Sequence, residues 1–346
     1  MEVNCEGCAG CCIDWRGLLE DGADAGDDSD EESARRHRRR RAPFGSDEKT
    51  TPSREPLDGD PSFVPLTRDE VRAFLEVGAG DALTLRFWHA RDEGEEPRSS
   101  GASSGDSPRG SEGVEIDGHS VAAVAGRPAF FVGLRKPPKP VAPFGREEPT
   151  WLPTCVFLDP TTLQCRIHDD DLYPDECSAY PEYNLALEQE TECERVEDAF
   201  GGDRLLEAGH GDPDGLLLGS QAIGAKLFCH PRPADLEGVV ERAAAGELSK
   251  RDRAEPVAVA AASSPGTLAI SEHHYERAKE RLLEGGGDDG GDESTAMDDE
   301  SWVGPAIRDW QRRCREAGEE IPAPEVADAV EVDRGAPETP GWDGFE

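Results

Sequence analysis

The stretch Cys5-Glu6-Gly7-Cys8-Ala9-Gly10-Cys11-Cys12 places four cysteines in eight positions near the start of the chain. Spacers of two residues let thiolates curl around one ion or cluster, and Gly7 and Gly10 permit the tight backbone turns that this requires. Cysteines used only for packing would follow the periodicity of a core, not a glycine-rich terminal segment. The stretch therefore predicts a metal or cluster site.

A second cysteine group follows much later in the chain, at Cys155, Cys165 and Cys177. The apolar runs beside Cys155 and Cys165 are separated by a proline turn, which predicts a small hairpin or knuckle with these two thiols at facing ends. The side chains of adjacent Cys11 and Cys12 diverge, so one of them is free to serve a second site. Because neither group then has a comfortable set of four ligands, we expect the two groups to meet in the folded protein.

Together the two groups offer eight candidate ligands. These are Cys5, Cys8, Cys11, Cys12, Cys155, Cys165 and Cys177, with His168 as the eighth. Eight ligands are enough for two closed tetrahedral zinc sites, and equally enough for one four-cysteine iron–sulfur cluster with ligands to spare. The residues alone do not choose between zinc and iron.

The same residues carry a resemblance to a known family. The motifs are Asn4-Cys5-x2-Cys8-x2-Cys11-Cys12, Cys155-Val156-Phe157-Leu158-Asp159, Cys165-Arg166-Ile167-His168 and Cys177-x2-Tyr180-Pro181, with Pro65-Leu66-Thr67-Arg68-Asp69-Glu70-Val71 between the halves. Over roughly residues 1 to 185 the chain resembles the YkgJ-type cysteine cluster family, the zinc- or iron-chelating CxxCxxCC domain, in a halophilic, haloarchaeal-like form.

The resemblance implies a bound zinc or iron, which includes an iron–sulfur cluster, and nominates the seven cysteines as metal ligands. It implies no defined biochemical role. Members commonly have Arg-Pro before the last cysteine, whereas this chain has Tyr173-Pro174, so the turn is retained but no arginine is implied near the metal. The family accepts Tyr or His at the position of His168, so His168 is not expected to be an obligatory ligand.

Three further cysteines fit a packing role better than a ligand role. Cys193 falls on a predicted acidic helix, and Cys229 ends another predicted helix beside His230. Cys314 lies among arginines, which would lower the pKa of its thiol, and we interpret it as structural. The pair His273-His274 is better explained by a solvated helix face than by a metal site.

The charge of the chain is extreme. It has 75 acidic and 37 basic residues, a formal net charge of −38, and only six of the basic residues are lysines. At molar salt the Debye length falls to about 3 Å, so the repulsion among so many carboxylates largely disappears. The composition therefore predicts a protein adapted to a salt-filled cytoplasm. Negative charge of this size also argues against nucleic acid or an anionic membrane as a partner.

Localisation and redox state follow from the same reading. No segment has the roughly 18 uninterrupted apolar residues that a membrane helix needs, and the first residues lack the features of a signal peptide. We therefore expect a cytoplasmic protein. Because cytoplasmic thiols are kept reduced, the clustered cysteines are better interpreted as metal ligands or redox groups than as disulfides.

The expected fold class is α+β, with a small metal-stapled cysteine-cluster domain of short strands and helices. This domain covers 1–200, with disordered acidic insertions at about 20–61 and 91–113. A helical extension covers 201–284. The last part, 285–346, holds a disordered spacer, one helix and an acidic tail. Helices are expected after Thr67, at 82–90, and near 185–200, 213–228, 234–248, 272–283 and 302–317. Strands are expected at 114–124, with a turn at Asp117-Gly118, and at 129–134.

Three functions remain open. The first is a metal-binding protein without catalysis of its own, because the sequence has no phosphate-cradling loop, dinucleotide fingerprint or nucleophile-and-base pair. The second is an iron–sulfur oxidoreductase or electron-transfer protein that uses the same thiolates. The third is a protein that binds an unknown protein partner and uses its metal only to hold the fold. The basic run Arg35 to Arg41 has no interleaved aromatic residue, which favours a charge-balancing loop over a nucleic-acid patch.

Overall fold

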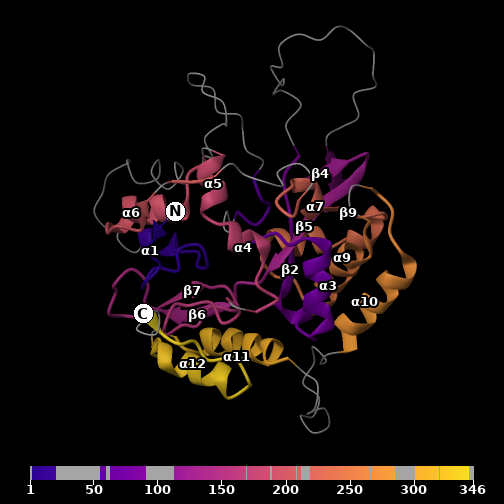
Figure 1. Ribbon diagram of the computed structural model, residues 1–346. Helices are drawn as coiled ribbons and strands as arrows, with labels where there is room; N and C mark the ends of the chain where they lie inside the picture. The colour runs from indigo at the N-terminus through magenta and orange to yellow at the C-terminus, as the bar shows by residue number, and fades with distance from the viewer. Residues whose placement is uncertain are drawn as a thin grey trace.

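The structure is a computed structural model that combines helices with short antiparallel strands (Figure 1). It describes residues 2–20, 55–59, 63–90, 113–168, 170–187, 189–207, 209–211, 219–264, 267–284, 301–318 and 320–342. The mixture of helix and strand predicted from the sequence is confirmed. The predicted insertions, the spacer at 285–299 and the run Arg35 to Arg41 lie almost wholly outside the described residues.

The strands build three antiparallel sheets. They are β1 (Glu2–Val3), β2 (Leu83–Phe87), β3 (Gly113–Ile116), β4 (His119–Val124), β5 (Arg127–Leu134), β6 (Pro138–Val141), β7 (Thr150–Pro153), β8 (Leu205–Glu207) and β9 (Leu227–Cys229). The central sheet has the order β2-β5-β4-β3, and β9 also pairs with β5. The other two sheets are the pairs β6-β7 and β1-β8.

The helices surround these sheets. The α-helices are α1 (Gly17–Glu20), α3 (Arg68–Glu76), α4 (Asp175–Ala179), α5 (Glu182–Ala186), α6 (Glu192–Phe200), α7 (Ile223–Lys226), α8 (Val239–Ala244), α9 (Lys250–Ala262), α10 (Glu272–Glu284), α11 (Val303–Glu316) and α12 (Pro324–Val332). The 3₁₀ helices are η1 (Gly80–Ala82) and η2 (Pro233–Leu236). None of the described helices has the length and apolar character needed to cross a membrane.

Two local predictions are confirmed in detail. Asp117 and Gly118 both have positive φ angles, +54° and +78°, and form the two-residue turn of the β3-β4 hairpin. Thr67 and Glu70 form the capping box of α3, because each side chain is hydrogen-bonded to the other residue's backbone amide. Turn and cap chemistry acts over a few residues, which is why the sequence alone reveals it.

The helix predicted at 82–90 is wrong. Leu83 to Phe87 forms β2, and its register places Leu85 opposite Val132 and Phe87 opposite Phe130 of β5. Leu85 and Phe87 are buried, as is Leu83. A short apolar run fits either a buried helix turn or a strand, and the pairing with β5 decides for the strand.

Gly133 in β5 allows a close approach that no other residue would permit. A Cβ at this position would lie 2.3 Å from the carbonyl oxygen of Val64 and 2.6 Å from the ring of Phe63. The segment before α3 therefore runs directly over the end of the sheet, where the Leu66 amide donates to the Val132 carbonyl at 2.8 Å. This contact anchors α3 to the sheet.

Helix α9 is the main cover of the central sheet, and the sequence did not predict it. It contacts β2 on one side and α10 on the other, and α3 packs beside it. Pro256 and every residue from Val257 to Ala262 are buried. A helix that is buried all round has no polar stripe, so no amphipathic period marks it in the sequence.

The remaining helix predictions vary in outcome. Helices α10 and α11 confirm the helices predicted near 272–283 and 302–317. The helix predicted near 185–200 is divided into α5 and α6. The helix predicted near 234–248 is replaced by the shorter η2 and α8. In the described part of the helix predicted at 213–228, only the single turn of α7 is helical, and Leu227–Cys229 instead forms β9, which pairs with β5. Residues 212–218 lie outside the described part.

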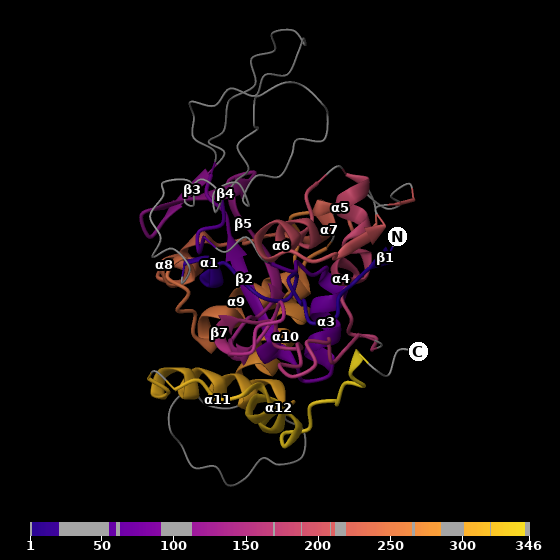
Figure 2. The same cartoon turned by 90° about the vertical axis from the view of Figure 1, so that its left-hand side faces the viewer.

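The C-terminal segment is a second correction. Residues after Gly318 were expected to form an acidic tail, but Pro324–Val332 forms α12, with Pro324 at its first turn, where a proline is well tolerated. Helices α11 and α12 both contact β6 (Figures 1 and 2, yellow helices at the bottom). These two helices thus pack against the β6-β7 hairpin that leads into the second cysteine group.

Candidate metal centre

The N-terminal cysteines lie on a loop of consecutive tight turns before α1. The amide of Cys8 donates to the carbonyl of Cys5 at 3.1 Å, and the amide of Cys12 donates to the carbonyl of Ala9 at 2.9 Å. Gly7 has a φ of +62°, a left-handed conformation that glycine adopts without strain. The two-residue spacers therefore fold as turns, as the sequence predicted.

This loop is seated on α6. A Cβ on Gly10 would lie 2.7 Å from Cγ2 of Val196 and 3.6 Å from Sγ of Cys8, so only glycine lets the loop approach the helix this closely. Nε1 of Trp15 also donates to the carboxylate of Glu192 at 3.2 Å. The cysteine loop and α6 are therefore one packed unit, although nearly two hundred residues separate them in sequence.

The structure brings the two cysteine groups together. The amide of Cys155 donates to the carbonyl of Cys12 at 2.8 Å, and Ile13 forms an isolated antiparallel bridge with Thr154. Beyond Cys155 the chain turns back, and Cys165 forms a bridge with Leu158. The predicted knuckle is thus one bridge long, and its first residue is joined to the end of the N-terminal cysteine loop.

Four thiols act on one another at this junction. Burial raises the pKa of Cys165 to about 12, with a further contribution from Cys155. Burial also raises the pKa of Cys177, on α4, far above its ordinary range, and Cys155, Cys11 and Cys165 add to the shift. The pKa of Cys12 is raised by its contact with Cys11, by burial, and by Cys155 and Cys165. The pKa shifts of Cys12 and Cys177 thus share contributions from Cys155 and Cys165.

A second set of thiols surrounds the start of the loop. Burial raises the pKa of Cys5 to about 11, and the thiols of Cys11 and Cys8 raise it further. Burial raises the pKa of Cys193, on α6, to about 12, with contributions from Cys11, Cys5 and Cys8. The sequence had favoured a packing role for Cys193. Its place among these thiols depends on how α6 packs, which no spacing pattern near Cys193 indicates.

Cys11 lies where the two sets meet. Its Sγ is 3.8 Å from Sγ of Cys12. This contact lowers the pKa of Cys11, which makes it the thiol most ready to lose its proton. The residue as a whole is exposed, but its sulfur faces the neighbouring thiols.

Two other cysteines, Cys229 and Cys314, lie apart from these thiols, and His168 packs beside them against Tyr173. The pKa of Cys314 is raised by burial alone, and the pKa of Cys229 is raised by burial against a lowering contribution from Arg127; no other thiol contributes to either shift. The ring of His168 packs against Tyr173, with 4.9 Å between the ring centroids. Cys229 and Cys314 therefore lack the thiol contributions that act on the other eight cysteines.

Tyr173 stands where the resembled family commonly has arginine. Burial raises the pKa of its phenol far above the ordinary range, and the thiols of Cys177 and Cys165 add to the shift. A neutral phenol therefore faces these sulfurs in place of a cation. The negative charge of thiolates here must be balanced by a bound ion or by more distant lysines, of which Lys136 and Lys139 lower the pKa of Cys155.

The sulfurs are not arranged as the complete ligand shell of a metal ion. Within the described ranges, no three cysteine sulfurs lie within 4.8 Å of one another, and the group of ligand atoms that meets this spacing is His230, Asp235 and Glu255. Sulfurs around a tetrahedral zinc are about 3.8 Å apart, since each Zn–S bond is about 2.3 Å. No described cysteine is in a disulfide. As a donor set, eight thiols in two neighbouring groups fit zinc or iron.

Residues 1–343 match a family of unknown function, DUF7531. The chain belongs to this family. No curated protein and no solved structure matches the chain. The DUF7531 match includes all ten cysteines, so both thiol sets and the elements that seat them lie within the family region.

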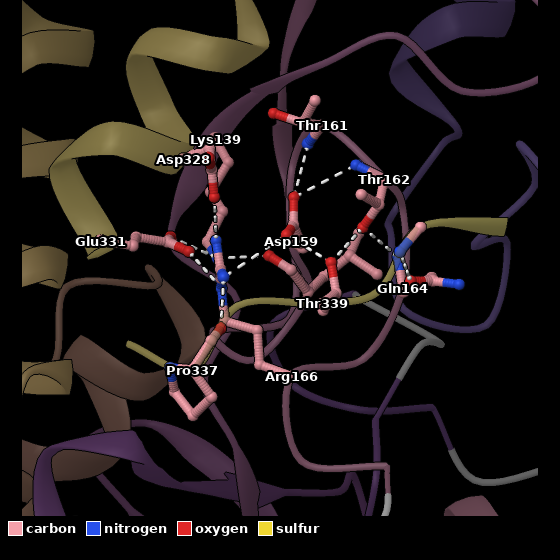
Figure 3. A network of polar contacts seen from close by, with 12 residues as sticks. Lys139, Asp159, Thr161, Thr162, Gln164, Arg166, Asp328, Glu331, Pro337 and Thr339 are labelled. Atoms are coloured by element: carbon pink, nitrogen blue, oxygen red, sulfur yellow. Dashed lines mark hydrogen bonds and ion pairs between the residues drawn. The ribbon is translucent and has the colours of Figure 1, made fainter. Parts of the chain in front are cut away.

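In this DUF7531 protein, buried ion pairs hold the knuckle between Cys155 and Cys165 in place (Figure 3). Nζ of Lys139 is fully buried, donates to the carbonyls of Val156 and Leu158 at 2.8 and 2.7 Å, and lies 2.6 Å from Glu331 of α12. The ammonium therefore fixes the backbone that follows Cys155.

The residue after Cys165 is held in the same way. The guanidinium of Arg166 pairs with Glu331 at 3.0 Å and with Asp328 at 2.8 Å, and it donates to the Pro337 carbonyl at 2.6 Å. In Figure 3 its charged end lies at the centre of the network between α12 and the knuckle. The sequence reveals none of these partners, because they lie more than 160 residues further along the chain. The C-terminal helix thus positions the second cysteine group.

Proposed function

We propose that this protein binds zinc or iron through two sets of four cysteine thiolates. The first set is Cys5, Cys8, Cys11 and Cys193, and the second is Cys12, Cys155, Cys165 and Cys177. In this arrangement adjacent Cys11 and Cys12 serve different sets, and the two sets adjoin at this pair, whose Sγ atoms are 3.8 Å apart. The observation that carries the proposal is the hydrogen bond from Cys155 to Cys12, which joins the two cysteine groups of the sequence.

The electrostatics of the thiols support a cation at this place. Eight thiols whose pKa values are mostly raised stay protonated in the metal-free protein, and each becomes a good ligand only when a cation replaces its proton. Metal binding should therefore release protons. Arg204 lies close enough to lower the pKa of Cys5 and Cys8, so it would offset part of the negative charge of the first set.

The resemblance to the YkgJ-type cysteine cluster family supports the same class of function. Its seven nominated ligands are all members of the two sets, and Cys193 is the eighth residue that completes them. A reducing cytoplasm, the compartment expected from the sequence, would keep these thiols available to a metal. We propose that the chain itself supplies no catalytic apparatus and that metal holding is its activity.

The test is metal analysis of the full chain, purified without oxygen in molar potassium chloride. We expect zinc or iron that stays bound through gel filtration and is removed by a strong chelator with uptake of protons. A colourless protein with bound zinc supports a structural or metal-handling role, whereas broad absorbance near 400 nm supports the iron–sulfur alternative. A chain that retains neither metal, even after reduction and incubation with zinc or ferrous iron, would contradict the proposal.

A further inference from the structure

A second group of metal-ligand side chains lies away from the cysteines, beside the central sheet. His230 follows β9, Asp235 lies in η2, and Glu255 lies on α9. Each offers one ligand atom, and the three atoms all lie within 4.8 Å of one another. The three residues come from different elements, so the group exists only in the folded chain.

His230 has an unsatisfied ring nitrogen inside the protein. The residue is fully buried, and its Nε2 has no hydrogen-bond partner. Its Nδ1 is 2.8 Å from the carbonyl oxygen of Arg232 and 3.3 Å from the amide nitrogen of the same residue. A carbonyl oxygen can only accept a hydrogen bond, and it is the closer partner. We therefore assign the proton of the imidazole to Nδ1. The lone pair of Nε2 then points at Oε1 of Glu255, 3.5 Å away, which is too long for a hydrogen bond.

Glu255 is ionised; its short hydrogen bonds go to Oε2, whereas Oε1 accepts from Arg232 at 3.4 Å. Its Oε2 accepts from the hydroxyl of Tyr275 at 2.5 Å and from Nζ of Lys279 at 2.6 Å. The carboxylate is held as an anion by its ion pair with the ammonium of Lys279. Two electron-rich atoms, Nε2 of His230 and Oε1 of Glu255, therefore face each other.

A side-chain cation already stands at this place. The guanidinium of Arg232 pairs with Asp235 at 2.5 Å and reaches Oε1 of Glu255 at 3.4 Å. The Arg232 side chain is 48% exposed, so it can swing into solvent without disturbing the core. It does not satisfy His230, since a guanidinium has no contact with Nε2 here and the ring nitrogen stays without a partner.

We propose that His230, Asp235 and Glu255 form a binding site for a divalent cation such as Mn²⁺, Fe²⁺ or Zn²⁺, with Arg232 as the group that the metal displaces. Imidazole and carboxylate ligands suit these ions, whereas soft thiolates do not suit manganese. The bond from Nδ1 to a backbone carbonyl is the support that metal-binding histidines usually have, because it fixes the tautomer and aims Nε2 at the metal. Three protein ligands leave coordination positions open for water or substrate.

The plain alternative is an ion-pair network with no metal. Such a network accounts for Glu255, Lys279 and Tyr275, whose contacts are all satisfied. It reaches Nε2 of His230 only at 3.5 Å from Oε1 of Glu255, which is too long for a hydrogen bond, and a buried polar atom without a partner is costly. A cation between the two atoms removes that cost.

Manganese titration of the full chain, followed by electron paramagnetic resonance, tests the site. The protein is first given only the two equivalents of zinc that the two proposed thiolate sets would take up, so that zinc does not occupy the His230 site. Molar potassium chloride screens the many surface carboxylates. We expect saturable manganese binding in the wild type. Asp235→Asn should weaken it by at least about tenfold, since even partners outside the ligand shell contribute that much to metal affinity. Arg232→Gln should tighten it severalfold, because the competing cation is gone.

Glu237→Gln is the matched control, since Glu237 is exposed, lies two residues from Asp235 and is outside the group. Circular dichroism and zinc content should be the same in all variants. Arg232 and Asp235 lie at the surface, so their replacement tests the site without loss of the fold. If the wild type shows no saturable binding, or if Asp235→Asn and Arg232→Gln bind manganese as the wild type does, the group is an ion-pair network and the proposal is wrong.

Discussion

At the level of single residues, Cys11 and Cys12 explain how one short loop can serve two sets of thiols. Their Sγ atoms lie 3.8 Å apart, and the Cys11 thiol contributes to the pKa shifts of Cys193 in one set and of Cys177 in the other. The shift in the pKa of Cys193 has contributions from Cys5, Cys8 and Cys11, whereas that of Cys12 has contributions from Cys155 and Cys165. The roles of the two adjacent residues can therefore be separated by mutation.

Cys193→Ser should remove metal from one set and leave the other set intact. The expected result is a partial loss of bound metal, with the remainder still held by the set that contains Cys155. Inductively coupled plasma mass spectrometry on protein in molar potassium chloride measures it. Cys155→Ser should give the complementary partial loss, and the double variant should lose nearly all the metal.

Cys314→Ser is the control for these variants. Cys314 lies on α11, and no other thiol contributes to its pKa shift, so its replacement should leave the metal content unchanged. Should Cys193→Ser behave as Cys314→Ser does, Cys193 is a packing residue and the first set does not hold a metal through four cysteines.

Glu331→Gln should destabilise the protein strongly. The Glu331 carboxylate is buried and faces two buried cations, Lys139 and Arg166. Removal of one partner from a buried ion pair leaves an uncompensated charge, which costs about 3–5 kcal/mol. Urea denaturation in molar potassium chloride should show this decrease in the free energy of unfolding.

Glu316→Gln is the matched control on the surface of α11. Its side chain is 63% exposed and pairs with Arg312, so the change should cost less than about 1 kcal/mol. Equal effects of Glu331→Gln and Glu316→Gln would mean that the buried network does not hold the C-terminal helix in place.

At the level of elements, the sequence predicts what local chemistry determines. The hairpin turn at Asp117-Gly118 and the capping box of Thr67 involve contacts over a few residues, and both were predicted. Helix α9 was missed because its apolar residues surround it on every side, and α12 was missed because acidic residues and prolines dominate its segment. Tertiary contacts stabilise both helices, and such contacts leave no local pattern.

The same distinction applies to the candidate site. The spacing of Cys5 to Cys12 and the position of Cys155 led to the expectation that the two groups meet, and the structure brings them together. It could not indicate Cys193 or Arg166, because their partners depend on how α6 and α12 pack. His230 and Glu255 were equally hidden, since they come from separate elements and neither lies in a motif.

The segment from Trp151 to Pro181 should loosen when its metal is lost. Beyond β7 and Thr154, the described residues of this segment form one β-bridge, Leu158 to Cys165, and an isolated two-stranded hairpin is marginal in water. Structural zinc contributes on the order of 10 kcal/mol of apparent free energy, which becomes folding free energy. Cys165→Ser should therefore lower metal content and hydrogen-exchange protection of this segment together, while α9 and α10 remain protected.

The ion-pair network allows a different outcome for the same experiment. Lys139 and Arg166 tie the knuckle to α12 without any metal. If Cys165→Ser loses metal while protection of this segment is unchanged, the network is sufficient to hold it, and the cysteines occupy a preformed scaffold. That result would favour a redox or metal-handling role over a structural one.

At the level of the whole molecule, the buried cations and the large excess of acidic residues have different surroundings. The fully buried cations, Lys139 and Arg166, are directly paired with carboxylates. The excess that produces a net charge of −38 is therefore carried by acidic residues for which the chain has too few basic partners. Like charges at this density oppose the compact state unless salt screens them.

The melting temperature should therefore rise with potassium chloride up to molar concentrations. At low salt the Debye length is about 30 Å, so carboxylates repel one another across much of the surface, whereas at 1 M it is about 3 Å and the repulsion is confined to direct neighbours. Buried pairs such as Lys139 and Glu331 are shielded from salt, so screening costs them little. Differential scanning fluorimetry across a potassium chloride series measures the effect.

Metal loss must be separated from screening in this experiment, because a metal released at low salt would also lower the melting temperature. The series is therefore repeated on the chelated protein, where the rise with salt should persist, since it originates in the surface carboxylates and not in the thiols. Sucrose at matched osmolality is the second control, because it favours compact states without screening charge. A melting temperature that stays flat or falls with potassium chloride, or that rises equally with sucrose, would mean that the acidic residues are not a salt-adapted surface.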